Sequence, residues 1–545
     1  MKLFFDKIYK FSFSDFFVFC IILLFFGFLS TIRLGDRIAP NTFYRDNSGF
    51  VIIDLKKDTI VRQIKVFNGE RHSDYNIFIS NDGVNYDYLR NINSNSSFSW
   101  DMINVYAKGR FIKFEFFDDF SVGEIAILNN SNRIINNINI VDGRNNMINM
   151  LTDEYSNIPV KRSYMNSTYF DEAYFARTAY EYVYNLKTYE WTHPPLGKII
   201  QAIPIYLTGY MSPFNYRFMG CIAGVLLIGI MYLFGTILFK KRIYGIVASF
   251  VMTFDTFRFA HSRMGTVDTY LVVFITLAFL FMILFHQQRK RRFLLLSGLF
   301  FGLSCCVKWT GLYSGFGLAF IYFYTIFKNR IFSYKYILYG FLFFVTIPFI
   351  IYYSTFRIFS NNYYRTDNLK SIIDENVLMY NYHSKLKATH FFSSKWYTWP
   401  ISYKPVWYHY QKIDNNHSES ISGVGNLVIW LGGIISFLYA IVLLIMKRDE
   451  LSLLLVTIIL TMWLPYVFVN RIMYLYHYFP VLPFLFLLIV NFLKDLSEKV
   501  KLKYLIPSYL LLCVIFFVLY FPVISGIQCN DTYKDKLKVF DTWYF

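Results

Sequence analysis

The sequence predicts a polytopic, mainly α-helical membrane protein with about eleven transmembrane helices and an external β-rich insert. The chain has 545 residues, is 55% hydrophobic and carries only 17% charged residues, and its mean hydropathy is +0.35. Its apolar residues gather into segments of about 17–25 residues, the length that crosses a bilayer core of roughly 30 Å. Between residues 50 and 128 apolar and polar residues alternate instead, which is typical of β-strands.

Basic residues are distributed as expected for the cytoplasmic loops of such a protein. The formal net charge is +18, but Lys and Arg gather in short clusters between the apolar spans. The clusters cover residues 240–242, 289–292, 328–335, 447–448 and 494–503. Because an excess of Lys and Arg marks cytoplasmic loops, the charge reports membrane topology and gives no reason to expect a nucleic-acid partner.

Placing these clusters on one side of the membrane gives an alternating path of spans. The expected spans cover residues 15–34, 215–239, 243–256, 268–286, 293–308, 310–327, 336–356, 424–446, 451–469, 472–493 and 504–525. The predicted domains are a first transmembrane helix (1–35), an external insert and linker (36–160), an external loop with interfacial helices (161–213), spans two to seven (214–356), a second external loop (357–422), spans eight to eleven (423–525) and an external tail (526–545). No small-x-small cleavage site follows the first span, so we interpret it as uncleaved.

The external insert is expected to be a β-sandwich of jelly-roll type. Alternating runs are separated by turn signals such as Asn81-Asp82-Gly83, a pattern typical of sandwiches. The segments YNIFISNDGVNYDYL, GRFIKFEF and VGEIAIL resemble discoidin-type, galactose-binding-like domains. Such a domain either binds a glycan or a lipid headgroup or serves as a spacer, and the sequence leaves both open.

Motifs for nucleotide and zinc chemistry are absent from the sequence. It contains no GxxxxGK[ST] loop, no GxGxxG after a strand, no HExxH and no CxxC pair. We therefore expect neither an ATP-driven pump nor a zinc protease, and we predict no required cofactor and no metal site. The adjacent carboxylates Asp171 and Glu172 are compatible with a divalent metal, but two oxygen ligands are weak support for one.

The stretch YFDEAYFARTAYEYVYNLKTYEWTHPPLGK, residues 169–198, is the strongest candidate for chemistry. Its apolar spacing predicts an interfacial amphipathic helix with Asp171 and Glu172 in the first turn. Acidic residues at a helix N-terminus can serve the helix dipole alone. That alternative does not explain why Glu190, His193 and Lys198 follow on the same external side, before the second span.

Successive motifs along the chain resemble those of the protein O-mannosyltransferase family, which are membrane glycosyltransferases of the GT-C type. The motifs are FDEAYFARTAY, THPPLGK, NYRFMGCIAG, HSRMGTVDTYLVVF, CVKWTGLY and RIMYLYHYFPVLPF. They occur in family order over most of residues 165–545. The β-rich insert departs from the eukaryotic members, which carry a β-trefoil in a later loop, and this bears on the acceptor more than on the reaction.

The resemblance implies a polyprenyl-phosphate-sugar donor and assigns roles to particular residues. Asp171 matches the family's essential Asp and Glu172 its neighbour, and these two are the predicted catalytic residues. The predicted phosphate-binding residues are Arg217, Arg263, Lys308 and Lys198, and the other predicted substrate-site residues are His193, Pro194, Asp268, Trp309, His383, His390 and Trp396. The structural alternatives are interfacial anchoring by Arg263 and Lys308, helix capping by Asp268, and an aromatic belt formed by His383, His390, Trp396, Trp399 and Trp407.

Physical chemistry supports this assignment. A lipid phosphate holds its reacting carbon at headgroup level, so catalytic residues should lie at the external ends of spans. Transfer to a hydroxyl needs a base, for which Asp171 is our choice, because a carboxylate partly desolvated near lipid has a raised proton affinity. Negative charge develops on the leaving phosphate, and cations stabilise it.

We expect an inverting glycosyltransferase that moves a sugar from the polyprenyl phosphate to Ser/Thr of exported proteins at the outer face of the plasma membrane. Mannose is the sugar that we expect. One alternative keeps the donor but has a lipid or cell-wall polymer as acceptor. A second is a transporter or flippase of polyprenyl-linked glycans, which should place ionisable residues near span centres. A third is a sugar-sensing receptor anchored by its spans.

Overall fold

The computed structural model describes residues 9, 12–71, 74–94, 96–142, 146–358, 368–500 and 504–545. Of the expected basic clusters, Lys501 and Lys503 lie outside the described residues. The chain divides into two compact units. The helical unit comprises Met1–Ile32, Asn185–Gln201 and Phe218–Phe545, and the sheet unit comprises Arg33–Tyr184 and Ala202–Arg217.

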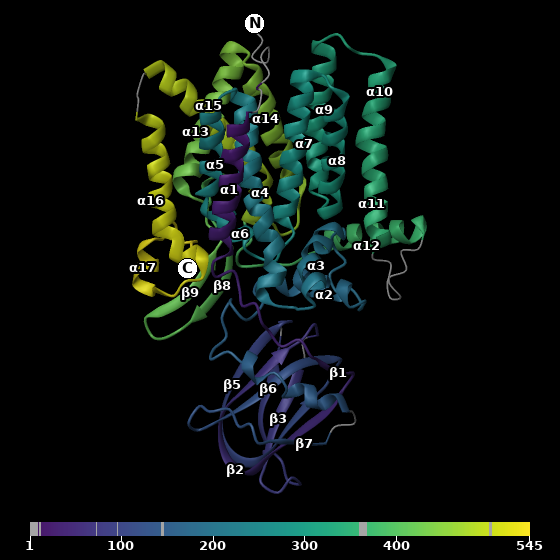
Figure 1. Ribbon diagram of the computed structural model, residues 1–545, viewed down its shortest axis with the longest axis vertical. Coiled ribbons are helices and arrows are strands. Elements are labelled where there is room, and N and C mark those ends of the chain that lie inside the picture. The colour runs from purple at the N-terminus through teal and green to yellow at the C-terminus, as the bar shows by residue number, and fades with distance from the viewer. Residues whose placement is uncertain are drawn as a thin grey trace. The chain divides into compact units, whose positions relative to one another are not determined.

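The helical unit is a bundle of long helices that run side by side (Figure 1). Its helices are α1 (Phe13–Thr31), α5 (Arg242–Thr253), α6 (Thr256–Ser262), α7 (Asp268–Gln288), α8 (Arg291–Val307), α9 (Gly311–Lys328), α10 (Tyr334–Phe341), α11 (Ile347–Ile358), α12 (Leu369–Lys385), α13 (Leu427–Lys447), α14 (Glu450–Trp463), α15 (Leu482–Val500), α16 (Leu505–Ser525) and α17 (Asp531–Lys536). Helices α3 (Leu196–Thr208) and α4 (Pro213–Phe239) pass from one unit into the other.

Shorter elements join these helices. A π-helical turn, η3 (Leu342–Thr346), connects α10 to α11, and the 3₁₀ turns η4 (Trp396–Ile401), η5 (Leu464–Phe468) and η6 (Leu475–Val481) lie between later helices. The strands β8 (Trp407–Lys412), β9 (His417–Ser422) and β10 (Cys529–Asn530) form a small antiparallel sheet in the order β10-β9-β8. This sheet brings the chain's C-terminal segment to the second long loop.

The bundle confirms a multi-pass, mainly helical membrane protein. Among the described residues, eight helices are long and apolar enough to cross a membrane, or nine if the bent pair α5–α6 is one span. That pair is bent by 65°. Helices α8 and α9 lie at the fifth and sixth expected spans but are not among these eight, so the count of eleven stays a prediction.

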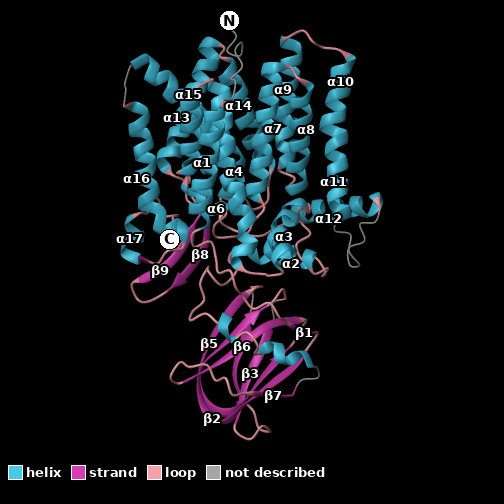
Figure 2. Cartoon of the chain, in the orientation of Figure 1, coloured by secondary structure: helices cyan, strands magenta, loops and turns pink. Residues whose placement is uncertain are grey.

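The sheet unit contains a seven-stranded antiparallel sheet in its described residues, shown in magenta in Figure 2. Its strands are β1 (Tyr44–Asp46), β2 (Gly49–Asn68), β3 (Asp74–Ser80), β4 (Asp87–Asn93), β5 (Ser99–Phe116), β6 (Phe120–Asn129) and β7 (Asn139–Asp142), and two short 3₁₀ turns, η1 (Asn146–Leu151) and η2 (Tyr155–Asn157), follow. The order is β1-β6-β2-β5-β3-β4, with β7 also on β2. The described strands form a single sheet, so the β-sandwich stays a prediction.

Alternating side chains of these strands build a single apolar core. Val51, Ile64 and Val66 of β2 and Ile112 and Phe114 of β5 are all fully buried in it. The long pair β2–β5 loses register twice, once in the stretch 54–59 and once in the stretch 61–63. Such irregularities bend a strand, which lets one sheet fold over its own core. The period-2 pattern in the sequence predicted this core.

Candidate active site

A cavity of about 630 Å³ lies in the helical unit. Three separate stretches of the chain form most of it: the turn before α3, the junction of α8 with α9, and helix α12. Its lining residues are Thr192, His193, Pro194, Lys308, Trp309, Thr310, Leu312, Tyr313, Tyr380, His383, Ser384, Leu386, Lys387, Phe468, Val469, Asn470 and Arg471. The sequence motifs THPPLGK and VKWTGL therefore meet in space, together with the second long loop.

Lys308 is held in this cavity by a carboxylate. It follows the last residue of α8, and Asp268 is the first residue of α7. The Nζ of Lys308 lies 2.9 Å from Oδ1 of Asp268, and both residues are 8% exposed. The ring of Tyr476 lies under the ammonium, 5.4 Å from its centroid. Asp268 thus holds the Lys308 ammonium in place, and this pair fixes the direction of the remaining N–H groups of Lys308.

His193 is fixed by a buried acid behind it. Glu190 accepts a hydrogen bond from Lys198 Nζ at 2.7 Å and lies 2.9 Å from His193 Nδ1. Lys198 also donates to the carbonyls of Glu190 and His193, so its ammonium is enclosed by the THPPLGK turn. Burial opposes ionisation of Glu190, but Lys198 and His193 hold the pKa of this carboxyl well below its usual range. Burial lowers the pKa of His193, against the attraction of Glu190.

His383 and Arg471 form a second polar pair at the cavity. Arg471 Nη1 donates to His383 Nδ1 at 2.6 Å, and His383 Nε2 donates to the carbonyl of Thr192 at 2.8 Å. Because Nδ1 accepts and Nε2 donates, the ring is the neutral Nε2–H tautomer. Burial, His193 and Arg471 lower the pKa of His383 to about 4, which agrees with the neutral ring. Arg471 therefore donates to an uncharged partner.

The two predicted catalytic residues lie in the sheet unit, in different environments. Helix α2 (Glu172–Val183) begins as the sequence predicted, with Asp171 at its N-cap and partly exposed. Glu172 is fully buried and forms a two-pronged pair with Arg217, at 2.7 Å for both contacts. The Arg217 guanidinium also donates to three backbone carbonyls, those of Leu34, Tyr164 and Ser167.

The remaining predicted site residues occupy other positions. Arg263 donates to the carbonyls of Ser30 and Ile32, where it ties the end of α1 to the end of α6. Trp309 lines the cavity and donates to Tyr352. His390 and Trp396 are not among the lining residues of this cavity in the described chain. The ring of Trp396 packs edge-on against Trp463, as in the alternative of an aromatic belt.

Besides Lys387, Arg471 is a charged lining residue to which sequence reasoning gave no role. It opens the RIMYLYHYFPVLPF segment, which carried the family resemblance without a role for its arginine. The signal was the arginine's position: it stands between η5 and η6, two short apolar turns. Its proximity to His383, 88 residues earlier, could not be read from spacing.

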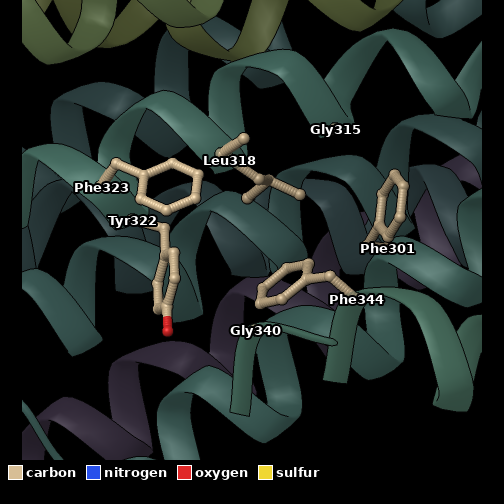
Figure 3. Close-up of a pocket in the computed structure, with 8 residues that line it drawn as sticks. Phe301, Gly315, Leu318, Tyr322, Phe323, Gly340 and Phe344 are labelled. Atoms are coloured by element: carbon tan, nitrogen blue, oxygen red, sulfur yellow. The ribbon is translucent and has the colours of Figure 1, made fainter. Parts of the chain in front are cut away.

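A second, apolar cavity of about 220 Å³ lies farther along α8 and α9. It is lined by Phe301, Gly315, Leu318, Ala319, Tyr322, Phe323, Gly340 and Phe344. Figure 3 shows the side chains of Phe301, Leu318, Tyr322 and Phe344 around a common space. Helix α8 contributes Phe301 to this cavity and ends next to Lys308, which lines the larger one. Helix α9 contributes Leu318 to this cavity and Tyr313 to the larger one, so both helices line or border both cavities.

One group of acids in the sheet unit has the composition of a metal site. Oxygens of Glu124, Asp153 and Glu154 all lie within 4.8 Å of one another. Burial, with the charges of Asp153 and Glu154 adding to it, raises the pKa of Glu124 to about 9. Oxygen ligands suit a hard cation such as Ca²⁺, or else a shared proton. No sequence motif points to any of these three acids.

Two family models match successive parts of the chain. One, described as "Dolichyl-phosphate-mannose-protein mannosyltransferase", matches residues 192–353. The other, "C-terminal four TMM region of protein-O-mannosyltransferase", matches residues 368–543. Together they include every residue that lines the larger cavity.

Curated proteins and solved structures agree with these models. A polyprenol-phosphate-mannose–protein mannosyltransferase of Mycolicibacterium smegmatis is 24% identical over 67% of this chain and 85% of its own length. One from Corynebacterium glutamicum is 32% identical over 24% of this chain and 30% of its own length. The S. cerevisiae protein O-mannosyltransferase Pmt1-Pmt2 complex bound to the sugar donor has a similar fold, with a TM-score of 0.61 at 12% identity over 69% of this chain and 89% of that chain.

The chain thus belongs to the protein O-mannosyltransferase family, and it is a membrane glycosyltransferase of the GT-C type.

Proposed function

We propose that this protein transfers mannose from a polyprenyl phosphate to Ser/Thr hydroxyls of exported proteins at the outer face of the plasma membrane. The observation that carries the proposal is the cavity lined by three cations, Lys308, Lys387 and Arg471, together with His193 and the neutral ring of His383. Cations among neutral donors favour a phosphate, and the matched relatives are named for a polyprenol-phosphate-mannose donor.

The reaction breaks the bond between the sugar's anomeric carbon and the phosphate oxygen. The acceptor oxygen forms the new bond to that carbon from the opposite side, and the phosphate diester leaves as a monoester with one more negative charge. Lys308 and Arg471 stabilise this developing charge, an electrostatic contribution that is large in a water-poor site. Asp268 and His383 position these cations, as their contacts at 2.9 and 2.6 Å support.

Asp171 is the proposed base that takes the proton of the acceptor hydroxyl. Its partial exposure at the start of α2 supports this role, because a base must be reached by the acceptor. Glu172 is fully buried and bound to Arg217, so we assign both of these residues a structural role. Lys198 and Arg263 likewise position backbone, through their bonds to carbonyl oxygens.

The apolar cavity is the proposed place of part of the donor's isoprenoid chain. Five of its lining residues belong to α9, the helix whose first turns reach the larger cavity. A chain bound there would run from the phosphate along a helix into the bilayer. The glycan ligand expected of the β-domain stays a prediction.

The test is transfer by the purified protein in nanodiscs, with polyprenyl-phosphate mannose and a Ser/Thr-rich peptide. Asp171→Asn should lose transfer by at least about 10²-fold, the typical contribution of a general base. Asp87→Asn, which changes an exposed acid of the same unit in the same way, serves as the matched control. Near-normal transfer by Asp171→Asn would show that Asp171 is not the base. Mannose found only on a lipid or a polymer would show that the acceptor is not a protein.

A further inference from the structure

We propose that the β-sheet domain positions the catalytic helix, through a polar clamp made by Arg45, Glu70 and Tyr180. The proposal rests on the proposed function, because it concerns how Asp171 is held. The three clamp residues and Asp171 all belong to the sheet unit, which also contains β1, β6 and α2.

The clamp is a hydrogen-bonded chain from a strand to the helix. Arg45 of β1 donates from Nε and Nη2 to the carboxylate of Glu70, at 2.7 and 3.2 Å. Its Nη2 also donates to the hydroxyl of Tyr180 on α2, at 2.9 Å. Ser121 of β6 donates to the same carboxylate at 2.8 Å. Glu70 and Tyr180 are only 2% and 3% exposed, so the carboxylate and the hydroxyl are bound where water is largely excluded.

Aromatic packing surrounds this clamp. The ring of Tyr180 lies 6.0 Å from that of Phe43 and 5.0 Å from that of Phe98. Phe98 has a φ of 51°, a left-handed conformation that a bulky residue rarely adopts unless its surroundings hold it there. A Cβ on Gly69 would overlap Ser121 and come within 2.8 Å of Phe43. The backbone next to Glu70 is therefore tightly packed against this aromatic cluster.

The chain leading to Asp171 is bound to the same sheet. Thr168 donates from its backbone N to the Phe98 carbonyl at 3.1 Å, and from its hydroxyl to the Ser97 carbonyl at 2.5 Å. Trp100 of β5 donates to the hydroxyl of Ser167 at 3.2 Å. Asp171 therefore lies between two attachments to the sheet, one at Thr168 and one at Tyr180.

This arrangement gives the domain a role in the reaction beyond that of a spacer. Displacing a catalytic group by about 1 Å can lower the reaction rate by about 10²-fold. We infer that Arg45 and Tyr180 are positioning residues: they touch neither donor nor acceptor, and they fix where the Asp171 carboxylate points. Their loss should lower kcat, with the affinity for the donor unchanged.

The test compares Tyr180→Phe and Arg45→Gln with Arg110→Gln in the full-length protein. Arg110 and Asp54 form an equally close pair on the same sheet, with Nε–Oδ1 at 2.8 Å, so this variant controls for loss of an ion pair. We expect kcat to fall about tenfold in the first two variants. The donor Kd and the melting temperature should stay close to those of Arg110→Gln. Equal kcat in all three variants would overturn the proposal.

A double-variant series separates positioning from general damage. In Asp171→Glu the carboxylate is already displaced by a methylene group, so adding Tyr180→Phe should cost clearly less than it does in the wild type. The same fold-loss in both backgrounds would show that Tyr180 does not act through Asp171. If Asp171→Asn itself retains transfer, the proposed base fails instead, and the two failures are distinguishable.

Discussion

The guanidinium of Arg471 donates to Nδ1 of His383, 2.6 Å away, and so a charged side chain is held by a neutral one. The ring passes its other hydrogen bond to the carbonyl of Thr192. The second long loop, the THPPLGK turn and the segment before η6 are thereby connected at one side of the cavity. The arrangement leaves the positive charge of Arg471 uncompensated by its partner.

His383→Gln should retain transfer within a few-fold, whereas His383→Ala should raise the donor KM about tenfold. Glutamine can accept from Arg471 and donate to the Thr192 carbonyl, while alanine leaves both groups unpaired. Because the pKa of His383 is lowered to about 4, the wild type and His383→Gln should have the same rate profile from about pH 5 to about pH 8. A rate step near the ordinary histidine pKa of about 6.5 that vanishes in His383→Gln would contradict the neutral ring.

Lys308→Met should reduce kcat/KM for the donor by about 10²–10³-fold, the usual effect of losing one group that stabilises developing charge. It also leaves Asp268 without its cation. Lys308→Arg should restore part of the rate, since a cation returns. Steady-state transfer in nanodiscs measures both, and Lys385→Ala, an exposed lysine of α12, is the control. Retained donor turnover in Lys308→Met would exclude its contact with the phosphate.

Two neighbouring acids in the sequence, Asp171 and Glu172, should respond differently to substitution, because Glu172 is fully buried in a pair with Arg217 and Asp171 is partly exposed. Arg217→Met removes the cation that is paired with the buried Glu172 carboxylate, which typically costs about 3–5 kcal/mol of stability. The double variant Glu172→Leu/Arg217→Met should be milder, because it buries no lone charge. Thermal unfolding in detergent measures this. If Arg217→Met unfolds like the wild type and weakens only donor binding, the phosphate role predicted for Arg217 is favoured instead.

Filling the apolar cavity should discriminate between donors by their chain length. In Gly315→Leu the added side chain points at Phe301, whose ring would lie 3.1 Å from the new Cβ. We expect a higher KM for the long-chain donor and an unchanged KM for a short-chain analogue, because only the former reaches the cavity. Equal effects on both donors would place the isoprenoid chain elsewhere.

Stability of the protein should fall as pH rises from about 4.5 to about 9 through the titration of Glu124. Burial raises the pKa of this carboxyl to about 9, so the folded state binds a proton that the unfolded state has released. The stabilisation is complete below the unfolded pKa and is lost as pH passes the folded one. Glu124→Gln should remove this slope in thermal unfolding. A wild-type curve parallel to that of the variant would show that the carboxyl is ionised in the fold.

The sequence predicted the elements but not the contacts between them. Helix α2 and the β-core follow from local periodicity, and the family motifs lead to His193 and Lys308. Periodicity says nothing about pairs such as Arg471 with His383, 88 residues apart. Nor can periodicity distinguish the roles of Asp171 and Glu172, because the two carboxylates are adjacent in the sequence. The structure distinguishes them: Glu172 is buried against an arginine, and Asp171 is partly exposed.

The sheet unit is discontinuous along the chain, because Ala202–Arg217 joins Arg33–Tyr184 after an excursion through the helical unit. The backbone of Asp36 alone is hydrogen-bonded to Met165 and to Phe214. A chimera that exchanges only the β-strands with a relative would therefore cut between bonded partners. For protein engineers the exchangeable cassette is two segments, 33–184 with 202–217, and recombination during evolution meets the same constraint.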